Sequence, residues 1–174
     1  MKRYNRLLPA LLCLLLCSSC TNQKSDAIPE FEIIREKIES YLNEYHSLSF
    51  DGKIISAEKE WQKKTSEGGA AFRYTANSNV IRYEIVLLHE TGQRVVNIHM
   101  LDDGIYIVDL RQIYDIPMVT EIKSVLDYEL RKFILLNDVL YLYGENNNTL
   151  TKSTDEEQSY LDLIHEAESL FEMQ

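Results

Sequence analysis

The sequence predicts an α+β domain in which an antiparallel meander sheet of about five to seven strands has N- and C-terminal helices packed on one of its faces. Apolar residues recur at helical spacing near both ends of the chain. Between residues 53 and 110 they instead alternate with polar residues, and short turn motifs interrupt the alternation. The chain shows no internal repeat and no low-complexity linker, which predicts a single globular domain over residues 29–174.

The two helices are expected at residues 29–46 and after residue 153. Pro29 suits the first turn of a helix, where a backbone N–H would have no partner. Near the other end, Ser153 or Thr154 can form a capping box with Glu156 or Glu157. The apolar positions that define these helices are Phe31, Ile34, Ile38, Tyr41, Leu42 and Tyr45 in the first, and Tyr160, Leu161, Ile164, Ala167, Leu170 and Phe171 in the second.

Turn motifs divide residues 70–110 into four strands, and residues 53–61 are expected to add a fifth. A two-residue loop at 91–92 pairs Ile98 with Ile85, and a three-residue loop that places Gly104 in the left-handed conformation pairs Ile98 with Val108. An even-length loop at 77–80 pairs Phe72 with Ile85. This register gathers apolar residues and tyrosines on one face, which the helices are expected to cover: Ala70, Phe72, Tyr74, Ala76, Ile81, Tyr83, Ile85, Leu87, Val96, Ile98, Met100, Tyr106, Val108 and Leu110.

The opposite face of this predicted sheet is only partly suited to water. Val86, Leu88, Leu101 and Ile107 add apolar area to a surface that also carries charged side chains. Because exposed apolar patches mark interaction sites, these four residues form a candidate binding face.

Residues 117–136 fit either a helix or a strand. Pro117 suits a helix start, whereas the spacing of apolar residues over 128–136 also fits a strand. The turn at Asn137-Asp138, followed by the apolar run 139–143, favours a hairpin, and residues 144–148 are expected to form a loop.

The N-terminal segment is typical of a secretory signal. Lys2, Arg3 and Arg6 precede an apolar stretch over residues 7–17, which is too short to span a membrane, and small residues follow it. The segment Cys17-Ser18-Ser19-Cys20 resembles the lipobox of bacterial lipoproteins, although Cys17 stands where an aliphatic residue is usual. The resemblance implies a signal peptide over residues 1–19, acylation of Cys20 and a tether over residues 20–28. It also implies attachment to the cell membrane or outer membrane, facing the extracytoplasmic side; the alternative is a plain secretory signal.

Cysteine content and charge narrow the classes of partner. All three cysteines lie in the first 20 residues, so the domain must fold without disulfides. The chain has 18 basic and 28 acidic residues, and loss of residues 1–19 removes three basic ones, which leaves 15 against 28 and a formal charge of −13. Such acidity argues against nucleic acid as a partner, and the membrane contact is expected to come from lipidated Cys20.

No motif in the chain predicts catalysis, a metal or a cofactor. The chain lacks the nucleophile-elbow, serine–lysine and zinc-protease patterns and any glycine-rich phosphate loop. The predicted register separates His89 from His99 by too great a distance for a shared metal, and it pairs His99 with Glu84 in a surface charge row. Asp102-Asp103-Gly104 has turn chemistry rather than the ligand spacing of a calcium loop.

These observations predict a non-enzymatic envelope lipoprotein that presents its domain for binding a protein or an apolar small molecule. One alternative is a hydrolase whose catalytic residues come together only in three dimensions. The other is an inhibitor or immunity-type protein, whose acidity would suit a basic partner.

Overall fold

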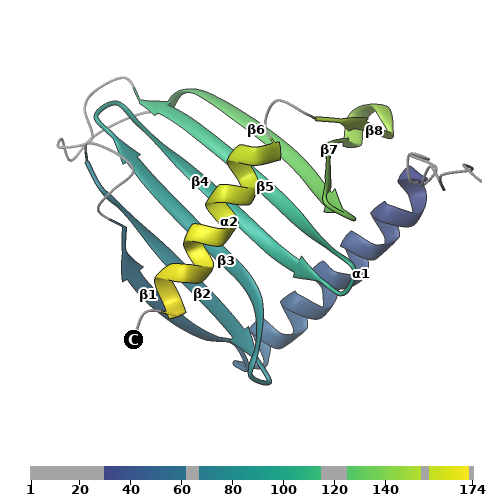
Figure 1. The fold of residues 1–174 in the computed structure, drawn as a ribbon, viewed down its shortest axis with the longest axis horizontal. Helices are drawn as coiled ribbons and strands as arrows, with labels where there is room; N and C mark the ends of the chain where they lie inside the picture. The colour runs from purple at the N-terminus through teal and green to yellow at the C-terminus, as the bar shows by residue number, and fades with distance from the viewer. Residues whose placement is uncertain (1–29, 62–66, 115–124, 154–156, 173–174) are drawn as a thin grey trace, which may run out of the picture.

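The computed structural model describes residues 30–61, 67–114, 125–153 and 157–172, which form one α+β fold (Figure 1). Helix α1 (Phe31–Phe50) precedes the sheet, and helix α2 (Glu157–Glu172) follows it. The strands between them are β1 (Ile55–Glu60), β2 (Gly69–Ala76), β3 (Asn79–His89), β4 (Gly92–Leu101), β5 (Gly104–Tyr114), β6 (Val125–Leu136), β7 (Val139–Gly144) and β8 (Thr149–Lys152).

The described strands form one antiparallel meander in which each strand pairs with the next in the chain, from β1 to β8. The predicted fold class is therefore confirmed, but the sheet has eight strands instead of the five to seven expected. The prediction missed β8. A short 3-10 turn over Glu145–Asn147, with Asn148 in the left-handed conformation at φ 50°, returns the chain so that β8 pairs with β7.

Two helix predictions and the late hairpin can be compared with the described residues. Helix α1 begins at Phe31, two residues later than expected, with Glu30 as its extended N-cap, and it continues one turn beyond residue 46, to Phe50. Strand β6 confirms the hairpin interpretation of residues 128–136. The proposed helix start at Pro117 and the proposed cap at Thr154 and Glu156 lie outside the described residues.

The register of the β3–β4 hairpin differs from the prediction without changing its faces. His89 pairs with Gly92 around a two-residue turn, so Ile85 lies opposite Val96. The predicted loop began one residue later, which moves every pair by two positions. Because side chains alternate with a period of two, the same residues still share a face.

The registers of β2 and β5 are each one residue from the prediction, and this exchanges their faces. Next to its turn, β2 pairs Ala76 with Asn79, and a bulge between Tyr74 and Thr75 then shifts the register by one residue, so that Ala71 rather than Phe72 pairs with Ile85. On the other side, Ile107 rather than Val108 pairs with Ile98. A one-residue slip moves every side chain of a strand to the opposite face.

The β4–β5 turn is one residue shorter than the predicted loop, and Gly104 has another role than the one predicted. Leu101 pairs directly with Gly104 around a tight turn, and Gly104 does not have a positive φ. A Cβ atom at this position would lie 2.7 Å from the carbonyl oxygen of Leu135. The absence of a side chain at Gly104 therefore allows β5 to approach β6 closely, and it is not needed for a left-handed turn.

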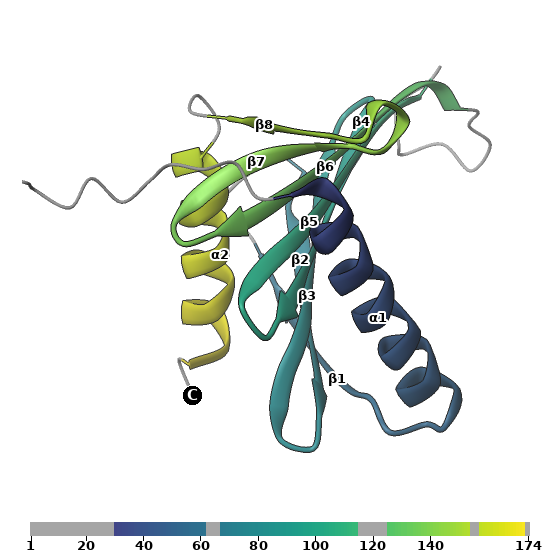
Figure 2. The ribbon, with the colours of Figure 1, turned by 90° about the vertical axis from the view of Figure 1, so that its right-hand side faces the viewer.

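The two helices lie on opposite faces of the sheet, which corrects the prediction that both cover one face (Figure 2). On the α2 face, Ile85, Ile98 and Ile107 pack with helix α2. On the α1 face, Tyr106 and Ile134 pack with helix α1. Both faces carry large apolar side chains, and each helix shields those of one face from water.

Helix α1 crosses the strands instead of following them. Its start contacts β7, where Phe31 stacks on Tyr143 with ring centroids 4.9 Å apart. Its second half reaches β3, where the Tyr41 hydroxyl donates a hydrogen bond to the carbonyl of Ile81. The helix thus follows a cross-strand row of paired residues, namely Tyr74, Arg82, His99, Tyr106, Ile134 and Tyr141. Of the described helices, none combines the length and apolarity that a membrane span requires.

Candidate functional site

An apolar row runs across five neighbouring strands on the α1 face, and we call it the apolar strip. Its members are paired in sequence from β2 to β6: Ala70, Val86, Val95, Leu110 and Leu130. None of them belongs to the buried clusters that the described residues form around the two helices. Leu130 is 49% exposed, and the other four are half-buried. Four strand spacings of about 4.8 Å make the strip about 19 Å long.

The rows on either side of the strip are mixed. Phe72 extends the apolar area on β2 toward helix α1, and Leu88 extends it on β3 away from that helix. Tyr128 on β6 is 68% exposed. At the β1 end, Glu60 pairs with Ala70 and Glu58 pairs with Phe72, and both glutamates are exposed. The strip therefore has an acidic end and an apolar end.

The four residues of the predicted binding face do not all meet. Val86 lies in the strip, and Leu88 lies two residues further along the same strand and on the same face. Leu101 packs instead against the cluster under helix α1. Ile107 is wrongly placed by the prediction: it is fully buried on the α2 face, because the actual register of β5 turns its odd-numbered residues toward α2.

The α2 face contains a buried ion pair that connects β4, β5 and helix α2. Asp109 is 1% exposed and accepts hydrogen bonds from Arg94, with Nε 3.0 Å from Oδ1 and Nη2 2.8 Å from Oδ2. The Tyr160 hydroxyl of α2 donates to the same Oδ2 at 2.6 Å. Burial, and then the hydrogen bond to Asp109, raise the pKa of Tyr160 above its ordinary value, so this hydroxyl keeps its proton.

Arg111 lies beside this pair but is held more loosely. It is 46% exposed, and its nearest carboxylate oxygens are 3.8 Å away on Asp109 and 3.9 Å away on Glu129. Both distances exceed those of ordinary hydrogen bonds. The guanidinium group can therefore still donate to a ligand.

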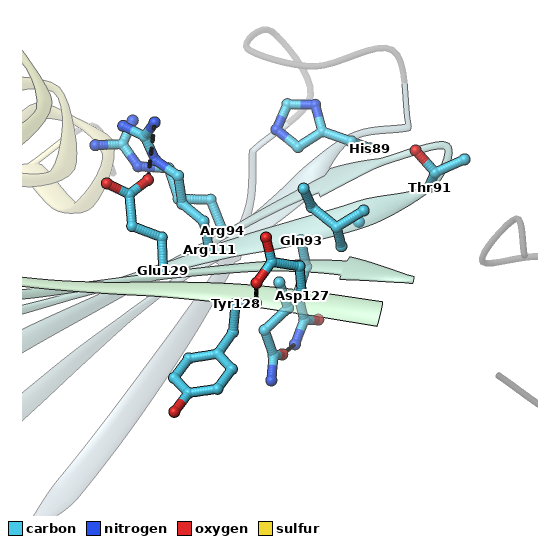
Figure 3. A pocket seen from close by; sticks show the side chains of 11 residues that line it. His89, Thr91, Gln93, Arg94, Arg111, Asp127, Tyr128 and Glu129 are labelled. Carbon is cyan, nitrogen blue, oxygen red and sulfur yellow. Dashed lines mark hydrogen bonds and ion pairs between the residues drawn. The ribbon is translucent and has the colours of Figure 1, made fainter. Parts of the chain in front are cut away.

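A pocket of about 580 Å³ adjoins these arginines at the ends of β3–β6 (Figure 3). Arg94, Arg111 and Glu129 lie together on one side of the strands, and Tyr128 points to the other side. The lining includes both signs of charge, because Asp127 and Glu129 accompany the two arginines. The full lining is His89, Thr91, Gly92, Gln93, Arg94, Arg111, Gln112, Ile113, Asp127, Tyr128 and Glu129. The charged side chains in this lining could orient a ligand that carries polar groups.

The sequence interpretation missed the pair of Arg94 and Asp109. One signal was present: Asp109 interrupts an apolar run in a predicted strand, and buried carboxylates are rare unless they are paired. Its partner could not be identified from the predicted register, which pairs Arg94 with His89. In the structure Arg94 pairs with Arg111 along the ladder and reaches Asp109 diagonally.

His99 is buried under helix α1 and does not form the predicted charge row with Glu84. It pairs with Arg82 along the ladder, whereas Glu84 pairs with Asn97. Its ring centroid lies 5.6 Å from that of Tyr41, 6.0 Å from that of Tyr45 and 5.8 Å from that of Tyr106.

The surroundings of His99 favour its neutral form. Its Nδ1 atom has no hydrogen-bond partner in the described part of the chain. Burial first, and then the charges of Arg82 and His46, lower the pKa of His99 from 6.5 to about 4.

The histidines that the sequence suggested as a metal pair are on opposite faces of the sheet. His89 lines the polar pocket on the α2 face, and His99 lies under α1. Within the described ranges, no group of three or more metal-ligating side chains is close enough to share an ion.

The structure thus presents two surfaces of different chemistry on opposite faces of one sheet. The apolar strip offers contact area beside helix α1, and the charged groups of the pocket, Arg94, Arg111 and Glu129, lie on the other side of the sheet at the ends of the strands. No family model, no curated protein and no solved structure matches this chain.

Proposed function

We propose that this chain is a lipid-anchored envelope protein whose domain binds a partner through the apolar strip and catalyses no reaction. One observation carries the proposal: five paired apolar residues, from Ala70 to Leu130, cross five strands without joining either buried cluster of the described residues. A contiguous apolar surface of this kind gains free energy when a partner removes it from water.

The N-terminal segment supports the anchoring part of the proposal. The basic residues, the apolar stretch and the lipobox-like residues 17–20 stand in the order that lipoprotein processing requires. Two or three acyl chains on Cys20 would hold the domain stably at a membrane. The acidity of the chain makes the lipid, rather than the protein surface, the expected membrane contact.

Metabolic labelling tests the anchor. The full chain is produced in a bacterium supplied with radioactive palmitate, together with Cys20→Ser and the matched variants Cys13→Ser and Cys17→Ser. We expect label and membrane sedimentation to be lost only in Cys20→Ser, because only that sulfur would carry the acyl group. Label retained by Cys20→Ser would contradict the proposal.

A further inference from the structure

We infer that the apolar strip is the docking site of an amphipathic helix with basic side chains, supplied by another protein, which lies beside helix α1 on the same face of the sheet. The inference rests on the proposed binding function and names the chemistry of the partner. It follows from the direction of the strip, its length and the charge at its end.

The strip runs parallel to the row on which α1 lies. Arg82, His99 and Tyr106 belong to the row under α1, and each strip residue on the same strand lies four positions away: Val86, Val95 and Leu110. Four residues along a strand correspond to about 13 Å. Packed helices lie about 8–10 Å apart, so a second helix fits beside α1 without displacing it.

The length and shape of the strip suit a helix. A helix of about 13 residues is as long as the strip, about 19 Å, and presents one apolar residue every three or four positions. Ala70, Val86 and Val95 make the first three positions of the strip small or β-branched. Leu110 and the exposed Leu130 give the β6 end longer side chains.

The charge of the chain selects a basic partner. Glu58 and Glu60 border the strip at its β1 end, and both are exposed. The one lysine in the adjoining row, Lys132, is bonded to Glu145 at 2.6 Å. The whole chain has a formal charge of −10, so a second copy would be repelled where a basic helix would be attracted.

The test uses the full acylated chain in nanodiscs of phosphatidylcholine and a fluorescent synthetic peptide. The peptide is a helix of about 14 residues with leucines on one face and lysines on the other. Two control peptides contain the same residues in scrambled order, or glutamate in place of lysine. The anisotropy measured with empty nanodiscs is subtracted, because this removes the signal of peptide that partitions into the lipid. We expect only the first peptide to bind the protein.

Strip variants locate the binding. Leu110→Glu and Leu130→Glu should each weaken binding about tenfold, because each places a charge where an apolar contact forms. Ile55→Glu is the matched control, since Ile55 is 71% exposed on β1 and faces away from the strip. A photoreactive residue at position 130, but not at position 55, should cross-link to the peptide; this readout remains informative if the Leu110→Glu variant folds poorly.

Charge variants test the basic character of the partner. Glu58→Lys with Glu60→Lys should weaken binding and reduce its dependence on salt. Glu36→Lys with Glu44→Lys, at two exposed positions of α1, is the control that makes the same change of charge elsewhere.

Four results would overturn the inference. Equal binding of the scrambled peptide would show that a helical stripe is not recognised. Unchanged binding by the strip variants would place the contact elsewhere. A dimer that Leu110→Glu converts to a monomer, without peptide binding, would identify the strip as a contact between copies of this chain. Palmitate on Cys20 without peptide binding would reject the helix and leave the anchor intact.

Discussion

Two buried polar residues, Asp109 and His99, are stabilised in opposite ways. Asp109 on the α2 face is surrounded by donors, with Arg94 and Tyr160 both bonded to its carboxylate. His99 on the α1 face has aromatic neighbours and a nearby cation, Arg82. Hydrogen-bond partners therefore compensate the burial of Asp109, whereas the surroundings of His99 favour its neutral form.

The depressed pKa of His99 predicts a loss of stability in mild acid. The unfolded chain takes up a proton near pH 6.5, whereas folded His99 does so only near pH 4. Stability therefore falls as the pH decreases through this window, by about 2 kcal/mol between pH 7 and pH 5. His99→Phe should remove this part of the pH dependence in urea unfolding, and His165→Gln, at an exposed position on α2, should not. Equal slopes for His99→Phe and the unaltered chain would contradict this account.

Asp109→Asn should destabilise the fold strongly. It leaves Arg94 largely buried without a carboxylate partner, a change that costs about 3 kcal/mol or more. Asp103→Asn is the comparison, because Asp103 pairs with Lys37 at an exposed site and should contribute less than about 1 kcal/mol. Urea unfolding at pH 7 measures both. Similar losses for the two variants would show that burial does not strengthen the Asp109 pair.

At the scale of single elements, the turns decide which residues share a face. The β2–β3 turn has positive φ at Asn77 and Ser78, and the β6–β7 turn has positive φ at Asn137 and Asp138. Two consecutive positive φ values characterise a type I′ hairpin turn. The β4–β5 turn at residues 102–103 does not use this conformation.

The turn conformations predict a stabilising substitution. Ser78 has a φ of 69°, where a side chain is disfavoured and glycine is not. Ser78→Gly should therefore raise the free energy of unfolding by about 0.5–1 kcal/mol. Asp102→Gly in the β4–β5 turn should give no such gain, because φ there is negative and glycine makes the unfolded chain more flexible. Thermal unfolding of both variants provides the measurement, and a gain from Asp102→Gly alone would contradict the argument.

At the scale of the whole molecule, each helix covers part of one face of the sheet. Helix α2 seals the apolar residues of β3–β6 from one side, and helix α1 crosses the other face at one end of the strands. Among the described residues, this leaves the strip from Ala70 to Leu130 without a covering helix. The arrangement provides the site of the proposed partner, because the open part of the face is parallel to α1.

Local patterns in the sequence determined the two helices, the order of the meander and the shared face of Ile85, Leu87, Val96 and Ile98. These features depend on spacing within one element or across one short turn, and a shift of two residues leaves the faces unchanged. The hairpin of β6 and β7 followed from the same kind of signal at Asn137-Asp138.

Only the tertiary structure decided which face of β5 meets which helix. In β5, Ile105 and Ile107 are apolar on one side, and Tyr106, Val108 and Leu110 are apolar on the other. When a strand is apolar on both sides, the pattern of apolar residues does not show which side faces which helix. A one-residue error in the length of the predicted turn therefore went undetected and placed Ile107 on the wrong face. In the structure, the two-residue turn at 102–103 decides the choice: Ile107 packs with α2, and Tyr106 and Val108 pack with α1. Leu110 then lies in the strip that we propose binds a partner.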